Sequence, residues 1–385
     1  MDMRAASLMA CALLAATPAL AGTRDLLIGL DEKITYDSNG QVNGAPGKDA
    51  VLVLDISNPD RPRIRASLPL MNSLLGPPTN LQITPDGKLG LVANSVVTTR
   101  DGDAWKIAMD NKLFVIDLAA NPPKLIDTVT VGSQPSGLAI SRKGDLALVA
   151  NRAGKSVSVL SIEDGAVKPL DEVPLEQEAA AVAISADGTR AFVCLNKANK
   201  IAVLGVDGRK VRYDTSLDIP SAFNPYNVDI TPDGHYAIVS NTGAQANNGD
   251  AVVVIEATGP HPHVVRIMSP GNGPEGFAIS PDGRWAVTPL LLGSGARDSD
   301  WFKTKDGELA VMSIGRDGTL AVTGRAQLGA LPEGIAFSPD SSRVYVANYI
   351  DQTLQTFRLV NGQPVQTGSA IKLPGQPASM RGIAH

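Results

Sequence analysis

Three residues in a recurring Pro-x-Gly context have side chains that could perform acid–base chemistry. Glu275 and Glu333 each occupy the variable position of a Pro-Glu-Gly triplet, and Arg381 precedes Gly382 near the C-terminus. Two carboxyl groups that crowd together raise the pKa of one of them, and an arginine can orient a ligand or hold an oxyanion. Glu275, Glu333 and Arg381 are therefore candidate catalytic residues of a hydrolytic enzyme. The alternative is a solvated ion-pair cluster that only balances charge.

Two tryptophans and two arginines are typical of a ligand-binding surface. Trp105 and Trp301 are two of only three tryptophans in the chain, and each stands in a run of charged residues that includes Arg100 or Arg297. A tryptophan exposed beside cations is common at binding surfaces. The alternative is that each tryptophan packs its own loop onto the molecule. We predict that these four residues, together with Arg381, hold a small anionic molecule or a partner protein.

Three more residues share the triplet context of the two glutamates. Tyr226 occupies the variable position of Pro225-Tyr226-Asn227, and Asn80 and Asn227 stand where other copies have glycine. Phenol and amide groups donate and accept hydrogen bonds. Tyr226, Asn80 and Asn227 are therefore predicted to contribute to the same ligand-binding site.

A repeated pattern must position these residues. It begins with Pro-x-Gly, continues as an alternating strand, turns at Pro-Asp-Gly and ends in an apolar strand closed by asparagine. The aligned apolar residue falls at positions 83, 140, 184, 230, 279 and 337, with spacings of 57, 44, 46, 49 and 58. A period in the forties with four short strands is typical of propeller blades. The last copy has Ser341 in place of the turn glycine, so its turn is predicted to differ.

Fragments at the two ends complete a seventh blade. Residues 381–384 match the first strand of the repeat, whereas residues 26–30, 50–56 and 64–68 match the second, third and fourth strands. Pairing both ends in one sheet leaves no terminal blade to fray. The sequence therefore predicts an all-β fold, a seven-bladed β-propeller of four-stranded blades, with residues 22–385 as one domain.

The repeats resemble those of the YVTN-repeat propellers. The resemblance is carried by Val346-Ala347-Asn348, by Leu91-Val92-Ala93-Asn94 and by the Pro-Asp-Gly turns, and it spans residues 22–385. The chain is also similar to the seven-bladed lactonase-like group, which implies a lactone-opening activity. That group typically shows a Gly-Pro-Arg-His element before a first strand. Here Met380-Arg381-Gly382 keeps the arginine without the histidine.

Long loops indicate which face of the propeller is functional. Alternating strand direction puts all loops between second and third strands on one face, together with the connections between blades. Four of these loops are long, namely 31–49, 95–111, 242–249 and 290–306. Long excursions in a compact repeat are usually functional or disordered. We predict that they surround the channel mouth and carry the binding site.

Histidine, serine and metal chemistry are not expected at this mouth. The histidines are His235, His261, His263 and His385, and strand order places all four on the opposite face. The chain lacks a Gly-x-Ser-x-Gly element. The three histidines of one blade could bind a transition metal, but His-Pro-His in a hairpin is more often turn composition. No cofactor and no metal site is predicted, and a structural divalent metal is left open.

The N-terminus and the composition indicate an exported protein. Arg4, the apolar residues 5–16 and Ala19-Leu20-Ala21 are typical of a signal peptide over residues 1–21. A rival interpretation treats Leu8 to Cys11 as a lipobox. No later run is long and apolar enough for a membrane span. The net charge of −5 gives no electrostatic footprint for nucleic acid. The remaining cysteine, Cys194, lies in an apolar strand pattern and is predicted to be a buried small hydrophobe.

Three functions are compatible with these residues. The first is a periplasmic binding protein or scaffold that recognises a small anionic ligand or a partner protein on the face with the long loops. The second is a lactonase-like hydrolase that opens a lactone or sugar-acid lactone. The third is an accessory subunit of a periplasmic redox enzyme, which rests on fold analogy alone.

The signal-peptide interpretation predicts a defined mature N-terminus. When the full chain is expressed in a Gram-negative bacterium, we expect the periplasmic form to begin at Gly22, because cleavage follows Ala21. N-terminal sequencing of that fraction checks the position. A mature chain that begins at a lipid-modified Cys11 would support the rival interpretation.

Overall fold

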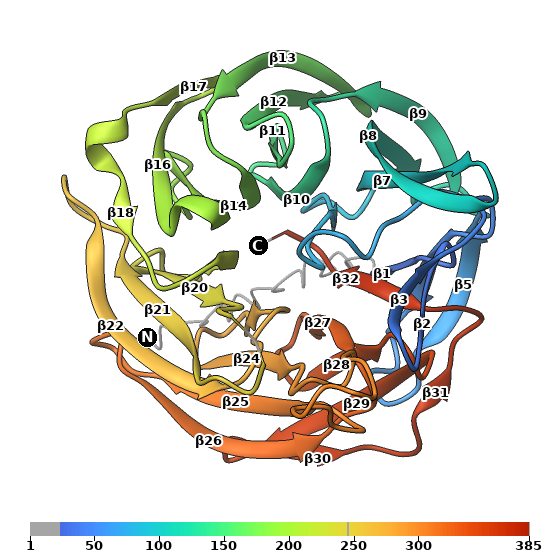
Figure 1. Ribbon diagram of the computed structural model, residues 1–385. Helices are drawn as coiled ribbons and strands as arrows, with labels where there is room; N and C mark the ends of the chain where they lie inside the picture. Colours follow the sequence, from blue (N-terminus) through green and yellow to red (C-terminus); the bar gives the residue numbers. More distant parts are fainter. Residues whose placement is uncertain (1–23, 245, 385) are drawn as a thin grey trace, which may run out of the picture.

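The computed structural model describes residues 24–244 and 246–384 of the chain. These residues form seven four-stranded antiparallel sheets arranged around a central channel, which is the predicted seven-bladed propeller (Figure 1). The predicted signal peptide and His385 lie outside the described residues. No helix of the described ranges is long and apolar enough to cross a bilayer.

The strands of each blade are named A to D from the channel outward. In order A to D they are β6 (Leu81–Ile83), β7 (Leu89–Asp101), β8 (Ala104–Asp117) and β9 (Lys124–Thr130) in blade 1; β10 (Pro135–Ile140), β11 (Leu146–Asn151), β12 (Ser156–Glu163) and β13 (Ala166–Pro174) in blade 2; β14 (Ala179–Ile184), β15 (Arg190–Leu195), β16 (Lys200–Asp207) and β17 (Lys210–Tyr213) in blade 3; β19 (Pro225–Ile230), β20 (Tyr236–Asn241), β21 (Asp250–Glu256) and β22 (His263–Gly271) in blade 4; β23 (Ala278–Ile279), β24 (Trp285–Leu290), β25 (Glu308–Ile314) and β26 (Leu320–Gln327) in blade 5; and β27 (Pro332–Phe337), β28 (Arg343–Asn348), β29 (Thr353–Val360) and β30 (Gln363–Gln366) in blade 6.

Blade 7 closes the ring with strands from both ends of the chain. The sheet order is β32 (Pro377–Arg381), β1 (Asp25–Leu30), β4 (Ala50–Asp55) and β5 (Arg63–Leu68), and β32 pairs antiparallel with β1. The closure follows the prediction, but the first strand covers 377–381 rather than 381–384. Each residue of β32 therefore lies at a different level of the channel from the level that the sequence predicted.

Short pieces complete the list. The strands β18 (Ile219–Pro220) and β31 (Ile371–Lys372) extend blades 3 and 6, and β2 (Ile34–Asp37) pairs with β3 (Gly40–Asn43) in a separate hairpin. Two 3-10 turns, η1 (Asn196–Ala198) and η2 (Thr215–Leu217), also occur among the described residues.

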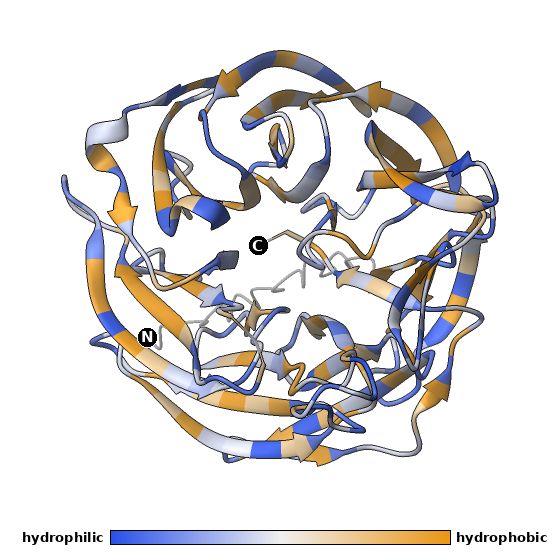
Figure 2. Ribbon diagram, viewed as in Figure 1, coloured by the Kyte–Doolittle hydropathy of each residue, from blue (hydrophilic) through white to orange (hydrophobic). Residues whose placement is uncertain are grey.

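Apolar packing between blades holds the ring together. One cluster of buried aliphatic and aromatic side chains fills each of the seven interfaces between neighbouring blades. In Figure 2 the outer strands β13, β22 and β26 alternate between apolar and polar residues, whereas β21 inside blade 4 carries a long apolar run. Sheets covered on both faces read as apolar runs, whereas sheets with one wet face alternate.

The turns between strands A and B share one backbone geometry, including the Ser341 turn that was predicted to differ. Gly283 turns with φ +71° and its N–H donates to Ser280 at 2.8 Å. Ser341 adopts φ +60° in the equivalent turn and donates to Ser338 at 2.9 Å. The prediction that this turn differs is therefore wrong. The Ser341 hydroxyl accepts a hydrogen bond from the Asp282 N–H of blade 5. This bond offsets part of the cost of positive φ in a residue with a Cβ.

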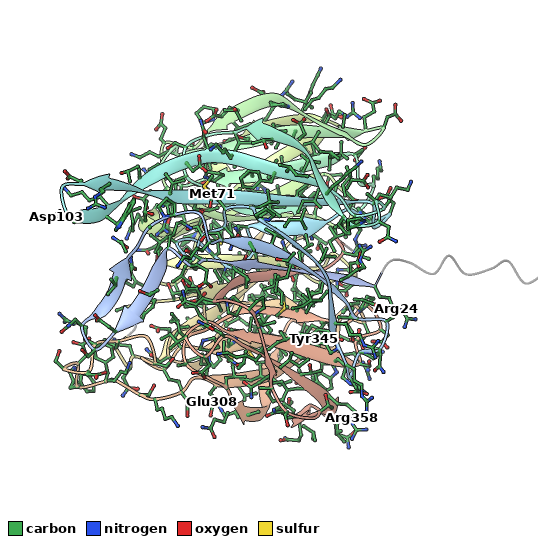
Figure 3. All side chains as sticks on the ribbon, turned by 90° about the vertical axis from the view of Figure 1, so that its right-hand side faces the viewer. Arg24, Met71, Asp103, Glu308, Tyr345 and Arg358 are labelled. Carbon is green, nitrogen blue, oxygen red and sulfur yellow. The ribbon has the colours of Figure 1, made fainter. Side chains whose placement is uncertain are left out.

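The long loops project from one face. In the side view of Figure 3, Asp103 at the tip of the β7–β8 hairpin lies on the opposite side from Arg24 and Arg358. Three loops contact one another there. The Asp298 N–H donates to Ser38 O at 2.9 Å, and the Thr98 hydroxyl donates to Gly44 O at 2.8 Å. We call these three loops, residues 31–49, 95–111 and 290–306, the insertion ridge.

A buried ion triad fixes the base of the ridge. Lys33 lies within 3.1 Å of Asp31 and 2.8 Å of Asp49, and all three residues are buried. Asp31 also accepts the Leu74 N–H at 2.8 Å, and Asp49 accepts the Glu32 N–H at 2.9 Å. These bonds tie the first loop of the ridge to the connection between blades 7 and 1.

We expect the triad to be sensitive to loss of its cation. Lys33→Met leaves two buried carboxylates unpaired and lowers the free energy of unfolding by about 3–5 kcal/mol. Denaturant unfolding measures the change. The matched control is Lys88→Met, because Lys88 pairs with Asp86 at 3.3 Å on the exposed surface and should cost less than about 1 kcal/mol. Equal effects for the two variants would contradict a structural role for the triad.

Candidate functional site

A cavity of about 400 Å³ opens on the face that bears the insertion ridge. Blades 4, 5 and 6 form its floor and the ridge forms its wall. We call it the mouth cavity, and its lining residues are Tyr36, Leu74, Leu75, Arg152, Asn224, Tyr226, Thr242, Asn272, Glu275, Leu291, Gly293, Gly295, Ala296, Asp300, Phe302, Leu331 and Glu333. Three of the four predicted long loops contribute to this lining, and the blade 1 hairpin does not.

Glu275 and Glu333 enter the cavity from neighbouring blades. Glu333 is the second residue of β27, and Glu275 precedes β23 in the same structural position. The glycine that follows explains the triplet, because a Cβ at Gly276 would collide with the backbone oxygen of Glu333. The Pro-Glu-Gly pattern thus lets two inner strands approach closely and brings both carboxyl groups to the channel.

The two carboxyl groups are poorly solvated and poorly paired. Glu333 is 2% exposed, and its Oε2 atom has no hydrogen-bond partner among the described residues. Burial raises the pKa of Glu275 to about 7, while the positive charge of Arg152 pulls in the opposite direction. Burial raises the pKa of Glu333 well above its usual range, and the charge of Glu275 adds to the rise. Both carboxyl groups are therefore protonated more readily than an exposed glutamate, and the proton on Glu275 exchanges near neutral pH.

Two asparagines leave further acceptors unpaired around the same cavity. The Oδ1 atoms of Asn224 and Asn272 are buried and have no partner among the described residues. Their amide nitrogens are occupied, since Asn224 donates to Thr242 at 2.6 Å and Asn272 donates to Asn248 O at 3.0 Å. The free atoms are acceptors, so the cavity favours a ligand with several hydroxyl or other donor groups.

Arg152 is the cation of the mouth cavity and escaped the sequence analysis. It belongs to the short loop after β11, and its guanidinium lies 5.6 Å from the centroid of the Tyr226 ring. Its Nε atom is 3.6 Å from a carboxylate oxygen of Glu178. It reaches Tyr226 because blade 3, which lies between them, carries only Ala180 at the equivalent position. The loop is too short to draw attention in the sequence.

Tyr36 is the second residue that the sequence analysis missed. It comes from β2 in the ridge, stacks edge-on against Tyr349 with centroids 6.2 Å apart, and lines the cavity. Burial raises the pKa of its hydroxyl, and the charges of Glu333 and Glu275 raise it further. The phenol therefore remains a neutral donor beside the two carboxyl groups.

Asn80 and Asn227 lie below the mouth cavity and have structural contacts. Asn80 is 2% exposed and donates to Asn72 Oδ1 at 2.8 Å. Asn227 accepts a 3.4 Å hydrogen bond from the Thr79 hydroxyl of blade 1, across the channel. Neither residue lines the mouth cavity, whereas Tyr226, which was predicted with them, does.

Arg381 does not join Glu275 and Glu333, which corrects the predicted triad. It pairs with Leu27 in the β32–β1 ladder, a register position equivalent to Ala336 rather than to Glu333. Ala378 holds the position of the glutamates in blade 7. Arg381 instead lies below the Thr79–Asn227 contact, 3.7 Å from Asp229. The misalignment arose because blade 7 has Ala378-Ser379 where blades 2, 5 and 6 have x-Gly.

The predicted rim residues lie on the insertion ridge, outside the lining of the mouth cavity. Trp301 is 80% exposed and packs edge-on against Phe302. Trp105 lies under the guanidinium of Arg100, 5.9 Å from the ring centroid. Arg297 pairs with Asp300 at 2.9 Å on the exposed surface.

The predicted histidine and cysteine positions can also be located in the structure. No group of three or more His, Cys, Asp or Glu side chains in the described part of the chain is placed to hold a metal ion. His261 precedes Pro262 in a turn and His263 begins β22, where the His263 ring contacts the backbone oxygen of His261. Cys194 is fully buried, as predicted from its strand pattern.

The comparisons with known proteins identify the fold. Searches against models of protein families and against curated proteins found no match. Among solved structures, a periplasmic gluconolactonase from Pseudomonas aeruginosa is 20% identical with a TM-score of 0.65, covering 93% of this chain and 98% of its own. A protein proposed to be a 6-phosphogluconolactonase from Bacteroides fragilis is 17% identical with a TM-score of 0.67, covering 95% and 99%. Hydrazine synthase from Kuenenia stuttgartiensis is 18% identical with a TM-score of 0.60, covering 80% and 90%. At these identities the likeness shows only that the chain shares the propeller fold of these proteins. Two of the three proteins are described as lactonases.

The raised pKa of Glu275 makes stability depend on pH. A carboxyl group whose pKa is higher in the folded state stabilises the fold below the unfolded pKa, and this contribution is lost as pH rises through about 7. Between pH 5 and pH 8 we therefore expect Glu275→Gln to gain more than about 1 kcal/mol of stability relative to the unmodified protein. Denaturant unfolding across this range tests it. The exposed Glu163→Gln variant should keep a constant difference, and a constant difference for Glu275→Gln would refute the shift.

Proposed function

We propose that the protein is a hydrolase that opens a lactone of a small polyhydroxylated acid in the mouth cavity. The observation that carries the proposal is the carboxyl pair of the mouth cavity, in which Glu275 is half-buried and Glu333 is buried with an unpartnered oxygen. A buried, unpaired carboxyl group costs free energy, and such groups cluster at functional sites. Two structural neighbours described as lactonases support the choice of reaction.

The geometry suggests separate roles for the two glutamates. Glu275, with a pKa of about 7, is partly ionised near neutral pH and accepts a proton from the attacking water. Glu333 stays protonated and donates a hydrogen bond to the carbonyl oxygen as negative charge develops there. The ring C–O bond then breaks, and the leaving alkoxide takes the proton from Glu275. The ring-opened hydroxy acid forms and loses its carboxyl proton to solvent.

The remaining lining residues would bind and orient the substrate. The acceptors Asn224 Oδ1 and Asn272 Oδ1 suit hydroxyl groups of the ligand. Arg152 suits the developing carboxylate, since its guanidinium is held at the cavity wall by Tyr226 and Glu178. This assignment replaces Arg381 with Arg152 as the arginine of the site.

Lactone turnover by matched variants tests the proposal. With glucono-1,5-lactone as the probe, we expect acid release above the spontaneous rate, increasing as pH rises through about 7 because Glu275 must be ionised. Glu275→Gln and Glu333→Gln should each lower kcat by about 10²–10⁴-fold, and Arg152→Met should act mainly on KM. The exposed Glu163→Gln variant is the control. Turnover that survives in both glutamine variants would overturn the assignment.

Recognition without chemistry is the second candidate, favoured by the 80% exposure of Trp301 on the insertion ridge. Solvent-exposed tryptophans are enriched at protein interfaces. Saturable binding of the probe without turnover, at any pH between 5 and 9, would favour this function. We also propose that the protein acts in the periplasm, on the basis of the signal-peptide pattern at its N-terminus.

A further inference from the structure

The opposite end of the channel contains a ring of seven equivalent positions, one from each blade. Strand register identifies these residues. In six blades the partner of each lies three residues before the end of strand B. In blade 1, whose strand B is extended, the partner Leu91 lies three residues before Asn94. They are Gln82, Ala139, Ala183, Asp229, Ala278, Ala336 and Arg381. Four of these positions carry the small side chain of alanine, and the other three carry polar side chains that line a cavity.

This ring borders a cavity of about 200 Å³, which we call the far-end cavity. Its lining is Asp25, Leu26, Ile56, Gln82, Asp229, Phe277, Ala278, Ile279, Pro281, Ile335, Ala336, Phe337, Pro339, Arg381, Gly382 and Ile383. It shares no lining residue with the mouth cavity, and the Thr79–Asn227 hydrogen bond crosses the channel between them. Its volume is below that of pockets for drug-sized ligands, which limits an occupant to a small molecule.

Arg381 has unused hydrogen-bond donors in this cavity. The side chain is 16% exposed, and its Nη1 atom donates to Leu138 O at 3.0 Å. The 3.7 Å separation of its Nη2 atom from Asp229 is an ion pair but too long for a hydrogen bond. Gln82 accepts the Ile140 N–H through Oε1, and its amide N–H groups have no partner among the described residues. A planar ligand carboxylate could accept hydrogen bonds from Arg381 and from Gln82 at the same time.

Asp229 has acceptor capacity left over. Its Oδ1 atom accepts the Ile230 N–H at 3.0 Å and its Oδ2 atom accepts the Ile279 N–H at 3.2 Å. A carboxylate offers about four acceptor positions, so two remain for a ligand. The backbone bonds fix the carboxylate in place, and it cannot turn to chelate Arg381.

The cavity is electrically balanced before anything binds. Arg381 faces Asp229, and Asp25 is paired with Arg65 at 2.6 Å. Adding a lone anion or a lone cation would leave an uncompensated charge in a largely buried space, which is costly. A ligand that carries both charges keeps the balance. The walls beyond the charged groups are apolar, from Phe277, Ile335 and Phe337.

We propose that the far-end cavity binds a small apolar amino acid as its zwitterion. Arg381 and Gln82 hold the carboxylate, Asp229 accepts from the ammonium group, and the side chain packs against the phenylalanines. This site is separate from the mouth cavity and does not depend on the hydrolase proposal. The sequence predicted that Arg381 acts in catalysis or helps to hold an anionic ligand at the mouth, whereas this proposal places its ligand at the opposite end of the channel.

Calorimetric titration of the mature protein with L-leucine tests the proposal, with 4-methylpentanoate and 3-methylbutylamine as analogues that each lack one charge. We expect saturable leucine binding and at least about tenfold weaker binding of both analogues. Arg381→Gln and Asp229→Asn should each weaken leucine binding by about tenfold or more, while Glu333→Gln in the mouth cavity should change it by less than about twofold.

A steric variant keeps the test valid if the charge variants fail to fold. Ala278→Leu fills the cavity and leaves every charged group in place, so we expect it to abolish leucine binding while the melting temperature is retained. No saturable binding of leucine, equal binding of either analogue, or leucine binding that survives in Ala278→Leu would overturn the proposal. Loss of lactone turnover with intact leucine binding, or the reverse, separates this site from the hydrolase.

Discussion

The pairing of β32 with β1 is the interaction on which the rest of the structure depends. It joins the two ends of the described chain in one sheet, so that every blade has two neighbours. The seven apolar interfaces can all be filled only when the ring is closed. An open ring would expose the faces of two blades and an unpaired strand edge, which proteins usually avoid. The channel, its mouth and its far end exist because this ladder holds.

Closure also explains which features could be predicted from the sequence. The recurring triplet, the Pro-Asp-Gly turn and the apolar strands are local signals, and together they gave the number of blades and the pairing of the two ends. The triplet also pointed to Glu275, Glu333 and Tyr226, and all three line the mouth cavity because equivalent positions on neighbouring blades face one channel. Ser341 shows what local signals cannot predict, because a hydrogen bond from Asp282 of blade 5 supports a turn that serine disfavours.

The features that escaped prediction depend on long-range contacts. Arg152 contacts Tyr226 because the blade between them carries alanine at the equivalent position. Tyr36 lies near the carboxyl pair because its hairpin is hydrogen-bonded to the long loop of blade 5. Arg381 was displaced by a register shift within a repeat that has lost its glycine. The rim tryptophans were found by composition, but composition carries no information about whether a side chain points inward or outward.

The placement of the two cavities has a consequence for how they could influence each other. They share no lining residue, so a molecule bound at one end would touch none of the side chains that line the other. The linings nevertheless come from the same inner segments, since Glu275 is followed by Phe277 and Ala278, and Glu333 by Ile335 and Ala336. A displacement of either segment along its own axis would therefore alter both cavities together.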